Sequence, residues 1–540
     1  MDAADRWYKN AIIYCLDVET FQDSDGDGVG DFKGLTSRLD YLWSLGVTCI
    51  WLLPFYPSPN RDNGYDVTDY YGVDERLGKP GDVAEFLHGA EQRGIRVIVD
   101  LVVNHTSDQH PWFQAARSDP NSRYRQFYVW SDEKPAGADE GVVFPGVQES
   151  TWTFDEKAGA YYHHRFYKHQ PDLNIGNAEV RDEIRRVMGF WLALGVSGFR
   201  VDAAPFLIEL PPTYEGEGDP FSYLDDFNEF LVWRKGHAIL LAEANVTHEK
   251  VLEYFGEGDR MQMIFNFYLN QHVFLALARG EVEPIVRALK KQPEIPPAAQ
   301  WANFLRNHDE IDLGRLTEKE RQECFAAFGP EPHMQIYERG VRRRLAPMLG
   351  GDRRRIELAF SLAFSLPGTP VLWYGDEIGM GDDLNLPERN SVRTPMQWSA
   401  GENAGFSEAA AHRLARPVID DGEYDYREVN VVAQHRDPGS LMNWMERLIS
   451  MRKECPEFGW GQVDILDSGH ADVLAVCSTW ENSSVLTLHN LGEKRRTARL
   501  NVGSELIDWF GNRAYAAPED DSIELDPYGY RWFRFGIHHT

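Results

Sequence analysis

An arginine and an aspartate, Arg200 and Asp202, end a short apolar run at residues 196–201 that has the composition of a buried strand. Side chains two residues apart lie on the same face of a strand, so we expect the guanidinium and the carboxylate side by side. An opposite charge nearby favours the ionised form of a carboxylate. Asp202 is therefore expected to stay charged and to serve as a nucleophile, with a buried structural ion pair as the alternative.

Two further acidic residues follow apolar runs in the same way, Glu243 after residues 238–242 and Asp309 after residues 301–305. In a barrel of parallel strands, the C-terminal ends converge on one pocket. Three carboxylates in one pocket are typical of a glycosidase, in which one attacks the anomeric carbon and another, with a raised pKa, protonates the leaving oxygen. The third can hold sugar hydroxyls as the oxocarbenium-like transition state develops. Together the three residues favour catalysis over a structural role.

The elements that must position these residues are eight short apolar runs that alternate with helical patterns, as in repeated βα units around a parallel sheet. One helical pattern, at residues 181–194, ends before a glycine that fits a helix C-cap, Gly195. The eight runs predict an α/β fold, a closed (β/α)8 TIM barrel. They lie at residues 11–16, 47–53, 97–103, 196–201, 238–242, 263–267, 301–305 and 371–374.

Two insertions and a C-terminal extension complete the expected domain organisation. Residues 104–172 are rich in aromatic side chains, and we interpret them as a domain inserted after the third strand, so that the barrel comprises residues 1–103 and 173–456. A charged, helix-like insertion at residues 314–344 follows the seventh strand and is expected to form a lid. From residue 457 to 540 the pattern changes to β-type runs separated by turn residues, which predicts a sandwich-like all-β domain.

Composition excludes several classes of partner. The chain of 540 residues has 55 Lys and Arg against 85 Asp and Glu, a net charge of −30, which disfavours nucleic acid and anionic membrane surfaces. Its five cysteines are scattered and suggest neither a disulfide framework nor a metal site. Neither a signal peptide nor a membrane-spanning run is visible. We expect a soluble, cytoplasmic protein, and the sequence leaves a homo-oligomer open.

An acidic loop near the N-terminus has the composition of a cation site. Asp23, Asp25, Asp27 and Asp31 alternate with small residues, and such a loop can wrap a hard cation with oxygen ligands. Position 12 counted from Asp23 is Gly34 and not a glutamate, which argues against an EF-hand. A solvated acidic turn is the alternative.

The strand ends resemble the signature regions of the α-amylase family, glycoside hydrolase family 13. The resemblance implies that Asp202 is the nucleophile, Glu243 the acid/base and Asp309 the stabiliser of the transition state in a retaining reaction. It also implies that Arg200, His105 and His308 orient the nucleophile and the glucose hydroxyls. The matching stretches are Asp100-Leu-Val-Val-Asn104-His105, Gly198-Phe-Arg-Val-Asp202-Ala, Glu243, Asn307-His308-Asp309 and Gln170-Pro-Asp-Leu-Asn174.

A further motif, Asp62-Asn-Gly-Tyr65-Asp, is similar to one in the exo-acting glucosidase branch of that family. This similarity implies that Tyr65 stacks on a terminal glucose. It also implies that Asp62 pairs with Arg393 and closes the pocket around that sugar. The alternative is that the two are surface residues that do not contact each other. A closed pocket predicts action on a terminal glucosyl unit and not cleavage within a starch chain.

The same resemblance extends to metal binding. The glucosidase branch carries a similar calcium loop, which implies a structural calcium ion held by the carboxylates of Asp23, Asp25, Asp27 and Asp31 and by the Val29 carbonyl. The wider family implies a second calcium ion at Asn104 and Asp172.

Six stretches resemble the branch of the family that interconverts maltose and trehalose, at residues 51–59, 106–113, 128–132, 169–174, 342–347 and 375–380. This implies a small α-glucoside substrate and transfer of its terminal glucosyl unit through a β-glucosyl-Asp intermediate. The chain departs from that branch at residues 14–21 and after the acid, in Glu243-Ala-Asn245-Val-Thr, so an α-glucosidase is the alternative. A non-catalytic relative and a metal-dependent hydrolase fit less well, because the carboxylates are present and few histidines follow the strands.

Overall fold

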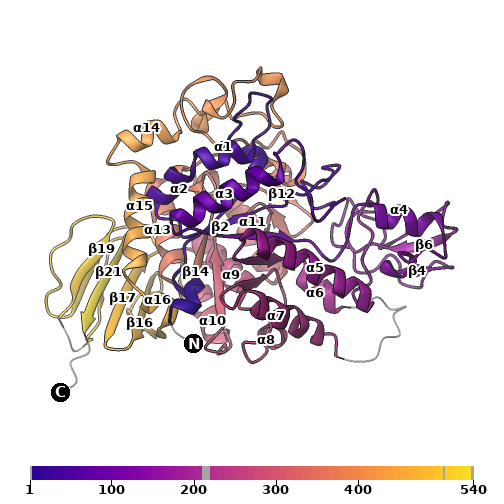
Figure 1. Cartoon of the computed structure of the whole chain (residues 1–540). Helices are drawn as coiled ribbons and strands as arrows, with labels where there is room; N and C mark the ends of the chain where they lie inside the picture. Colours follow the sequence, from indigo (N-terminus) through magenta and orange to yellow (C-terminus); the bar gives the residue numbers. More distant parts are fainter. Residues whose placement is uncertain (1–2, 210–218, 503–504, 537–540) are drawn as a thin grey trace.

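Eight parallel strands form a closed barrel, in which the first and the last strand along the chain also pair with each other (Figure 1). The computed structural model describes residues 3–209, 219–502 and 505–536. The predicted (β/α)8 barrel is confirmed, and each predicted run overlaps one of its strands. Around the barrel the strands are β1 (Ile13–Leu16), β2 (Cys49–Leu52), β3 (Arg96–Leu101), β7 (Gly198–Val201), β8 (Ile239–Ala242), β9 (Met263–Phe265), β10 (Gln300–Phe304) and β14 (Thr369–Trp373).

The register of the barrel brings the charged residues of two strands together. Arg200 on β7 lies opposite Asp100 on β3, and on its other side it lies opposite Leu241 on β8. Gly198 begins β7 with a φ of 149°, and a Cβ atom there would meet the Ile239 carbonyl oxygen at 2.3 Å. Only glycine therefore allows β7 to approach β8 this closely.

Helices cover the outside of the barrel, and α5 (Ala178–Leu194) shows why they form. Asn177 caps its first turn by accepting a hydrogen bond from the Glu179 amide, and its apolar residues recur at helical spacing and are buried. Gly195 ends it with a φ of 122°, as predicted. The other barrel helices are α1 (Phe32–Ser37), α2 (Leu39–Leu45), α3 (Pro80–Gln92), α6 (Ala204–Ile208), α7 (Ser222–Arg234), α8 (His248–Phe255), α9 (Phe267–Arg279), α10 (Glu283–Lys291), α12 (Leu345–Met348), α13 (Arg353–Ser365), α14 (Val431–Arg436), α15 (Leu441–Lys453) and α16 (Glu457–Trp460).

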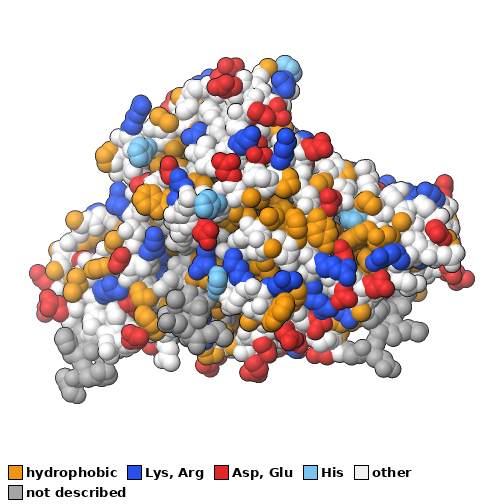
Figure 2. Space-filling model, viewed as in Figure 1, with side chains coloured by type: hydrophobic (Ala, Val, Ile, Leu, Met, Phe, Trp, Pro, Cys, Tyr) orange, Lys and Arg blue, Asp and Glu red, His pale blue; other side chains and the backbone are white. Residues whose placement is uncertain are grey.

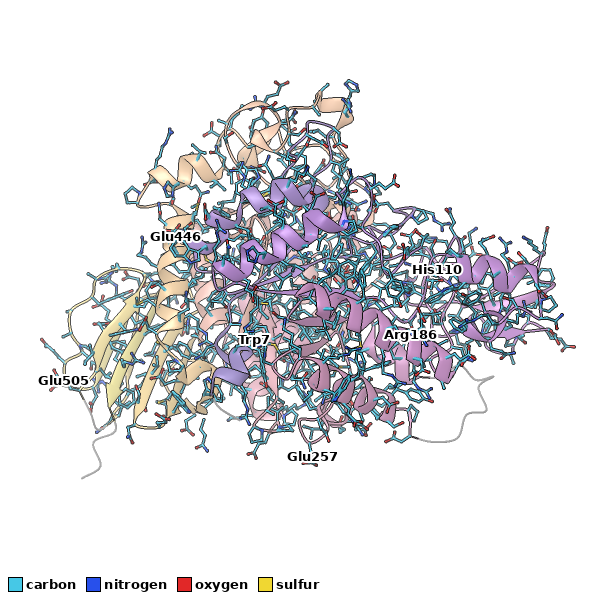
Figure 3. All side chains as sticks on the ribbon, viewed as in Figure 1. Trp7, His110, Arg186, Glu257, Glu446 and Glu505 are labelled. Carbon is cyan, nitrogen blue, oxygen red and sulfur yellow. The ribbon has the colours of Figure 1, made fainter. Side chains whose placement is uncertain are left out.

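The segment between β3 and α5 projects from one side of the barrel (Figure 1). It contains α4 (Pro111–Ser118) and a three-stranded sheet of β4 (Trp130–Ser131), β6 (Ala160–His163) and β5 (Trp152–Asp155). Its aromatic residues form its core, where the rings of Phe113 and Trp130 stack with centroids 5.6 Å apart. His110, labelled in Figure 3, caps α4 by accepting a hydrogen bond of 3.1 Å from the Trp112 amide.

The insertion after β10 differs from the expected helical lid. It contains one helix, α11 (Glu318–Phe328), but also a three-stranded antiparallel sheet of β11 (Ile311–Asp312), β13 (Gly340–Val341) and β12 (Gln335–Ile336). Strands of two residues are too short to show an alternating pattern, so the sequence contained no signal for this sheet.

The C-terminal residues form two antiparallel sheets on the side of the barrel away from the inserted segment (Figure 1). Apolar side chains of both sheets, such as Leu486 and Ile523, form a shared core, while Leu474, Val485 and Trp532 of the larger sheet join the main core. The larger sheet comprises, in order, β15 (Gln462–Leu466), β16 (Val473–Trp480), β17 (Ser483–Asn490), β21 (Tyr530–Gly536) and β19 (Ile507–Gly511), and the smaller β18 (Arg496–Arg499) and β20 (Ser522–Leu525).

The surface and the cysteines agree with the composition. Figure 2 shows acidic and basic side chains interspersed over the visible face and no continuous basic patch there. All five cysteines are buried and free. In the described part of the chain, no helix is long and apolar enough to cross a membrane.

Candidate active site

One guanidinium holds three carboxylates at the ends of neighbouring barrel strands. Arg200 is 1% exposed, and its Nη1 atom lies 2.6 Å from Oδ1 of Asp202 and 2.5 Å from Oδ1 of Asp100. Its Nη2 atom lies 2.8 Å from Oε2 of Glu243, which also accepts a 3.0 Å hydrogen bond from the Ala203 amide. The structure thus brings Asp202 and Glu243 together on one cation, as the barrel predicted.

The pKa of Asp202 is raised and not lowered, although the expected Arg200 guanidinium lies beside it. Burial raises the pKa of Asp202 to about 7, because it outweighs the nearby Arg200 guanidinium, which lowers that pKa. Burial likewise raises the pKa of Glu243 to about 7 and that of Asp100 to about 6. A single guanidinium cannot neutralise three buried carboxylates, so near neutral pH protons are shared among them.

Asp309 lies in the opposite electrostatic environment. Burial would raise its pKa, but His308, Arg389 and Arg393 together hold the pKa of Asp309 well below its usual range. The closest atoms are Arg389 Nη1 at 2.7 Å, Arg393 Nη2 at 3.1 Å and His308 Nε2 at 3.2 Å. Asp309 therefore stays ionised at any pH at which the protein functions.

The partner expected for Asp62 is also wrong. Asp62 pairs with Arg389, whose Nη2 atom lies 3.0 Å from Oδ1 of Asp62, and not with Arg393. Arg393 instead donates from Nε to the His308 carbonyl at 2.7 Å and contacts Asp309. Arg389 thus joins Asp62 to Asp309, a role that the sequence analysis missed.

The choice between the two arginines depends on a local turn. Residues Glu388–Val392 form a 3-10 helix, η6, which Pro387 precedes and Arg393 follows as capping residues. This turn directs both arginines toward Asp309 but only Arg389 toward Asp62. The sequence showed two arginines four residues apart, but it could not show which of them reaches the loop at Asp62.

Aromatic and imidazole rings form the wall next to these ion pairs. The rings of Tyr65 and His308 are parallel within 9°, with centroids 5.5 Å apart, and the Tyr65 hydroxyl lies 2.8 Å from His308 Nε2. His105 lies 3.1 Å from the Tyr65 carbonyl through Nε2. Burial lowers the pKa of both His105 and His308, so we expect neutral rings that act through hydrogen bonds.

These residues line one cavity of about 430 Å³, within the range of small-molecule sites. Asp62 and Arg389 form a polar part of its wall, and residues of the insertion after β10 also line it. All residues predicted to act on a sugar line this cavity or contact a residue that does. Its lining comprises Asp62, Tyr65, His105, Val143, Phe144, Phe166, Asp202, Ala203, Pro205, Phe206, Glu209, Glu243, Asn245, Val246, Phe267, Asn307, His308, Asp309, Glu310, Asp312, Gly314, Arg315, Arg339 and Arg389.

The end of the cavity away from Asp62 is bounded by contacts among three segments. Asn245, two residues after Glu243, donates from Nδ2 to Oδ2 of Asp312 at 3.1 Å. Arg315 donates to the backbone carbonyl and to the side-chain oxygen of Asn245. Arg339 donates from Nη1 to the Val143 carbonyl of the inserted segment at 2.9 Å. The insertion after β10 therefore covers this part of the cavity. Its contact there is with Asn245, which belongs to the stretch after Glu243 where the sequence departs from the maltose–trehalose branch.

The acidic loop partly fulfils the expectation for a cation site. Carboxylate oxygens of Asp23, Asp25 and Asp27 lie within 4.8 Å of one another, which fits a single cation with oxygen ligands. Burial and the neighbouring Asp27 carboxylate raise the pKa of Asp25. Asp31 is not in this group, because it caps α1 by accepting from the Gly34 amide and also binds Ser24. The role of the Val29 carbonyl in binding a cation stays a prediction.

The second expected calcium site does not fit its surroundings. Asn104 donates to Asp172 Oδ1 at 3.2 Å, so the structure does bring these residues together. However, Asp172 also accepts from the Arg165 amide at 3.0 Å, and His163 Nδ1 lies 2.9 Å from its Oδ2. Protein donors already surround the carboxylate, and we therefore derive nothing from a cation there.

Two families match the chain. Residues 15–328 and 340–461 match the α-amylase catalytic domain, and residues 483–534 match the C-terminal domain of sucrose hydrolase-like proteins. The two matches correspond to the barrel and the C-terminal sheets.

Several known proteins are similar over nearly the whole chain. A trehalose synthase of Thermus thermophilus is 44% identical over 98% of this chain and 55% of its own length, so the chain spans about half of that relative. A trehalose synthase of Pimelobacter sp. is 41% identical over 98% of this chain and 96% of its own length. The solved structure of the sucrose-bound enzyme MutB superimposes with a TM-score of 0.79 at 26% identity, covering 98% of this chain and 99% of that one.

Proposed function

This chain belongs to the α-amylase family, and we propose that it interconverts maltose and trehalose by moving one terminal glucosyl unit. The observation that carries the proposal is the cavity in which Asp202, Glu243 and Asp309 meet and which Asp62 and Arg389 close at one end. The relatives named as trehalose synthases support the choice of substrates, with 41% and 44% identity over 98% of the chain. A cavity of this size is within the range of small-molecule sites, which supports a small sugar as the substrate.

Asp202 is the proposed nucleophile. Within the described part of the chain its Oδ1 atom accepts from Arg200, whereas Oδ2 has no hydrogen-bond donor. Oδ2 can therefore attack the anomeric carbon of the terminal glucose and form a β-glucosyl ester, while the bond from that carbon to the glycosidic oxygen breaks. Asp309, which stays ionised, stabilises the positive charge that develops on the sugar.

Glu243 is the proposed acid and base. Its raised pKa lets it hold a proton near neutral pH and give that proton to the departing glycosidic oxygen. The released glucose then reorients, and its own anomeric hydroxyl attacks the anomeric carbon of the glucosyl ester. The bond from that carbon to Asp202 breaks and restores the carboxylate, while the hydroxyl proton returns to Glu243. Two inversions at the donor carbon give net retention, and attack by the α-anomer of the released glucose then gives the α,α-linked disaccharide.

Isomerisation requires that the released glucose stay in the cavity and that water stay out. The contacts of Asn245, Asp312 and Arg315 at the far end support this, because they connect the loop after β8 to the insertion after β10. Arg339 connects the same insertion to the inserted segment after β3.

The second candidate is an α-glucosidase, in which water takes the place of the second glucose. An oligo-1,6-glucosidase of Heyndrickxia coagulans is 32% identical over 90% of this chain, below the identity of the trehalose synthases. Incubation of the protein with maltose, with products followed by NMR, separates the two candidates. Trehalose as the main product is expected, and glucose as the only product would favour the hydrolase.

For the acidic loop, we propose a structural calcium ion at Asp23, Asp25 and Asp27. The loop contacts a segment that follows β14, since Ser407 Oγ donates to Asp23 at 2.5 Å and the Ala415 amide donates to the Gly28 carbonyl at 2.9 Å. An ion there would fix this segment to the end of β1.

A further inference from the structure

A cluster of three buried charged residues, Asp17, Glu19 and Arg416, lies behind the Asp62 end of the cavity, with the exposed Arg76 at its edge. Asp17 and Glu19, just after β1, meet Arg416, from the segment after β14, and Arg76. Arg416 is only 8% exposed, although its ion pairs lie outside the catalytic carboxylates. The catalytic mechanism uses none of these four residues. Arg76 also pairs with Asp74 at 2.7 Å, so Arg416 is the buried guanidinium that faces both Asp17 and Glu19.

Arg416 contacts three different parts of the chain. Its Nη2 atom lies 3.0 Å from Oε2 of Glu19 and donates to the side-chain oxygen of Asn63. Its Nη1 atom donates to the Arg393 carbonyl at 3.0 Å and lies 3.5 Å from Oδ2 of Asp17. One planar group thus fixes the end of β1, the loop that carries Asn63 and the backbone of Arg393.

Asn63 is fixed from both sides. Its Nδ2 atom donates to Asp17 Oδ2 at 3.1 Å, while its Oδ1 atom accepts from Arg416. Its φ is 50°, in the left-handed region, which asparagine tolerates better than most residues. Asp62, the residue before Asn63, forms the ion pair with Arg389, and Tyr65 follows Asn63 by two residues.

The other side of the cluster reaches the same loop. Glu19 Oε1 accepts from Asn60 Nδ2 at 2.8 Å and from Arg76 Nη1 at 2.6 Å. Asn60 also has a left-handed φ, of 56°. The cluster therefore holds Asn60 and Asn63, which lie on either side of Asp62 in the loop.

We propose that Arg416 is a positioning residue for the terminal-glucose end of the cavity, acting through Asn63 on Asp62. A small displacement of groups that hold a bound sugar weakens its binding strongly. Asp62 lies at the sugar's far end and not at the reacting bond, so its displacement affects substrate and transition state alike. This inference rests on the proposed function only in its choice of maltose as the substrate.

The test compares two variants that break the contacts differently. Arg416→Met removes the cation, whereas Asn63→Gly removes only the amide, tolerates the positive φ and leaves the ion pairs in place. We expect both to raise KM for maltose about tenfold, with kcat changed less than about threefold, and to raise the Kd for glucose by a similar factor in calorimetry. Unchanged KM and Kd in Asn63→Gly would overturn the proposal.

Stability and positioning are separated by a third variant. Arg416→Met leaves two carboxylates buried near a single cation, so we expect a lower Tm. Adding Asp17→Asn and Glu19→Gln removes those stranded charges and is expected to recover part of the Tm while KM stays raised. A KM that returns to normal together with the Tm would show a merely structural role.

A buried arginine far from the cavity provides the control. Arg531, on β21, is 1% exposed and pairs with Asp508 at 2.5 Å. Arg531→Met is expected to lower Tm without changing KM or the glucose Kd. If the unaltered protein fails to convert maltose, the proposed function fails, but the glucose Kd values still decide whether Arg416 positions the site.

Discussion

Asp62 and Arg389 form an ion pair of 3.0 Å that closes one end of the cavity, and the same guanidinium reaches Asp309 at 2.7 Å. One side chain thus links the residue that we propose binds the terminal glucose to the carboxylate that we propose stabilises its transition state.

Replacing this arginine is the first prediction. Arg389→Ala leaves Asp62 and Asp309 without a shared partner, so we expect kcat/KM for maltose to fall roughly 100-fold, measured by steady-state kinetics. Arg354→Ala is the matched control, because Arg354 pairs with Asp352 at the surface. Equal kcat/KM in Arg389→Ala and the unaltered protein would contradict the position of the pair in the binding site.

The pH dependence follows from the carboxylates on Arg200. Burial raises the pKa of Asp202 and of Glu243 to about 7, and the reaction needs Asp202 ionised and Glu243 protonated. Activity should fall at low pH, where Asp202 takes a proton, and at high pH, where Glu243 loses its proton. We expect a bell-shaped profile of kcat/KM with its maximum near neutral pH. A plateau that extends well below about pH 5 would contradict the raised pKa of the nucleophile.

The acid role of Glu243 is tested by the leaving group. Glu243→Gln should lower kcat for maltose by about 10² to 10⁴, because the departing oxygen needs a proton. With 2,4-dinitrophenyl α-glucoside the leaving group needs none, so the rate of its release in a stopped-flow burst should change little. Glu249→Gln, on the exposed side of α8, is the control. Equal losses on both substrates would exclude proton donation by this residue.

Calcium binding predicts a change in stability. A ligand that binds only the folded state at 100 times its Kd stabilises that state by about 2.7 kcal/mol. We expect chelation to lower the Tm measured by calorimetry, calcium to restore it, and Asp25→Asn to abolish the difference. Asp40→Asn, at an exposed carboxylate of α2, should keep it. A Tm that is the same with chelator and with calcium would contradict the site.

The far end of the cavity should determine the product ratio. Arg315→Ala removes the contacts to Asn245 and opens a path for water, so the ratio of glucose to trehalose formed from maltose should rise. NMR of the products measures this ratio. Lys319→Ala changes an exposed residue of α11 in the same insertion and should leave it unchanged. A constant ratio in Arg315→Ala would exclude a role of this contact in retaining glucose.

The sequence predicted the barrel because each strand is a buried apolar run between helices with clear periodicity, as around α5 and β7. It also predicted that Asp202, Glu243 and Asp309 would meet, because parallel strands end at the same rim of a barrel. These predictions depend on local pattern and on topology alone.

Other features depend on distances that no local pattern records. The pKa of Asp202 depends on how deeply it is buried and on how many carboxylates share Arg200, which only the folded chain determines. The choice of Arg389 over Arg393 depends on the turn of η6. The sheet in the insertion after β10 has strands of two residues, which show no periodicity.

The most direct test of the account is to trap the covalent intermediate. The protein is incubated with 5-fluoro-α-glucosyl fluoride, digested, and its peptides are analysed by mass spectrometry. We expect one glycosylated peptide with the sugar on Asp202, and none in Asp202→Asn. A sugar on any other carboxylate of the cavity, or full turnover of maltose by Asp202→Asn, would contradict the assignment of the nucleophile and the mechanism built on it.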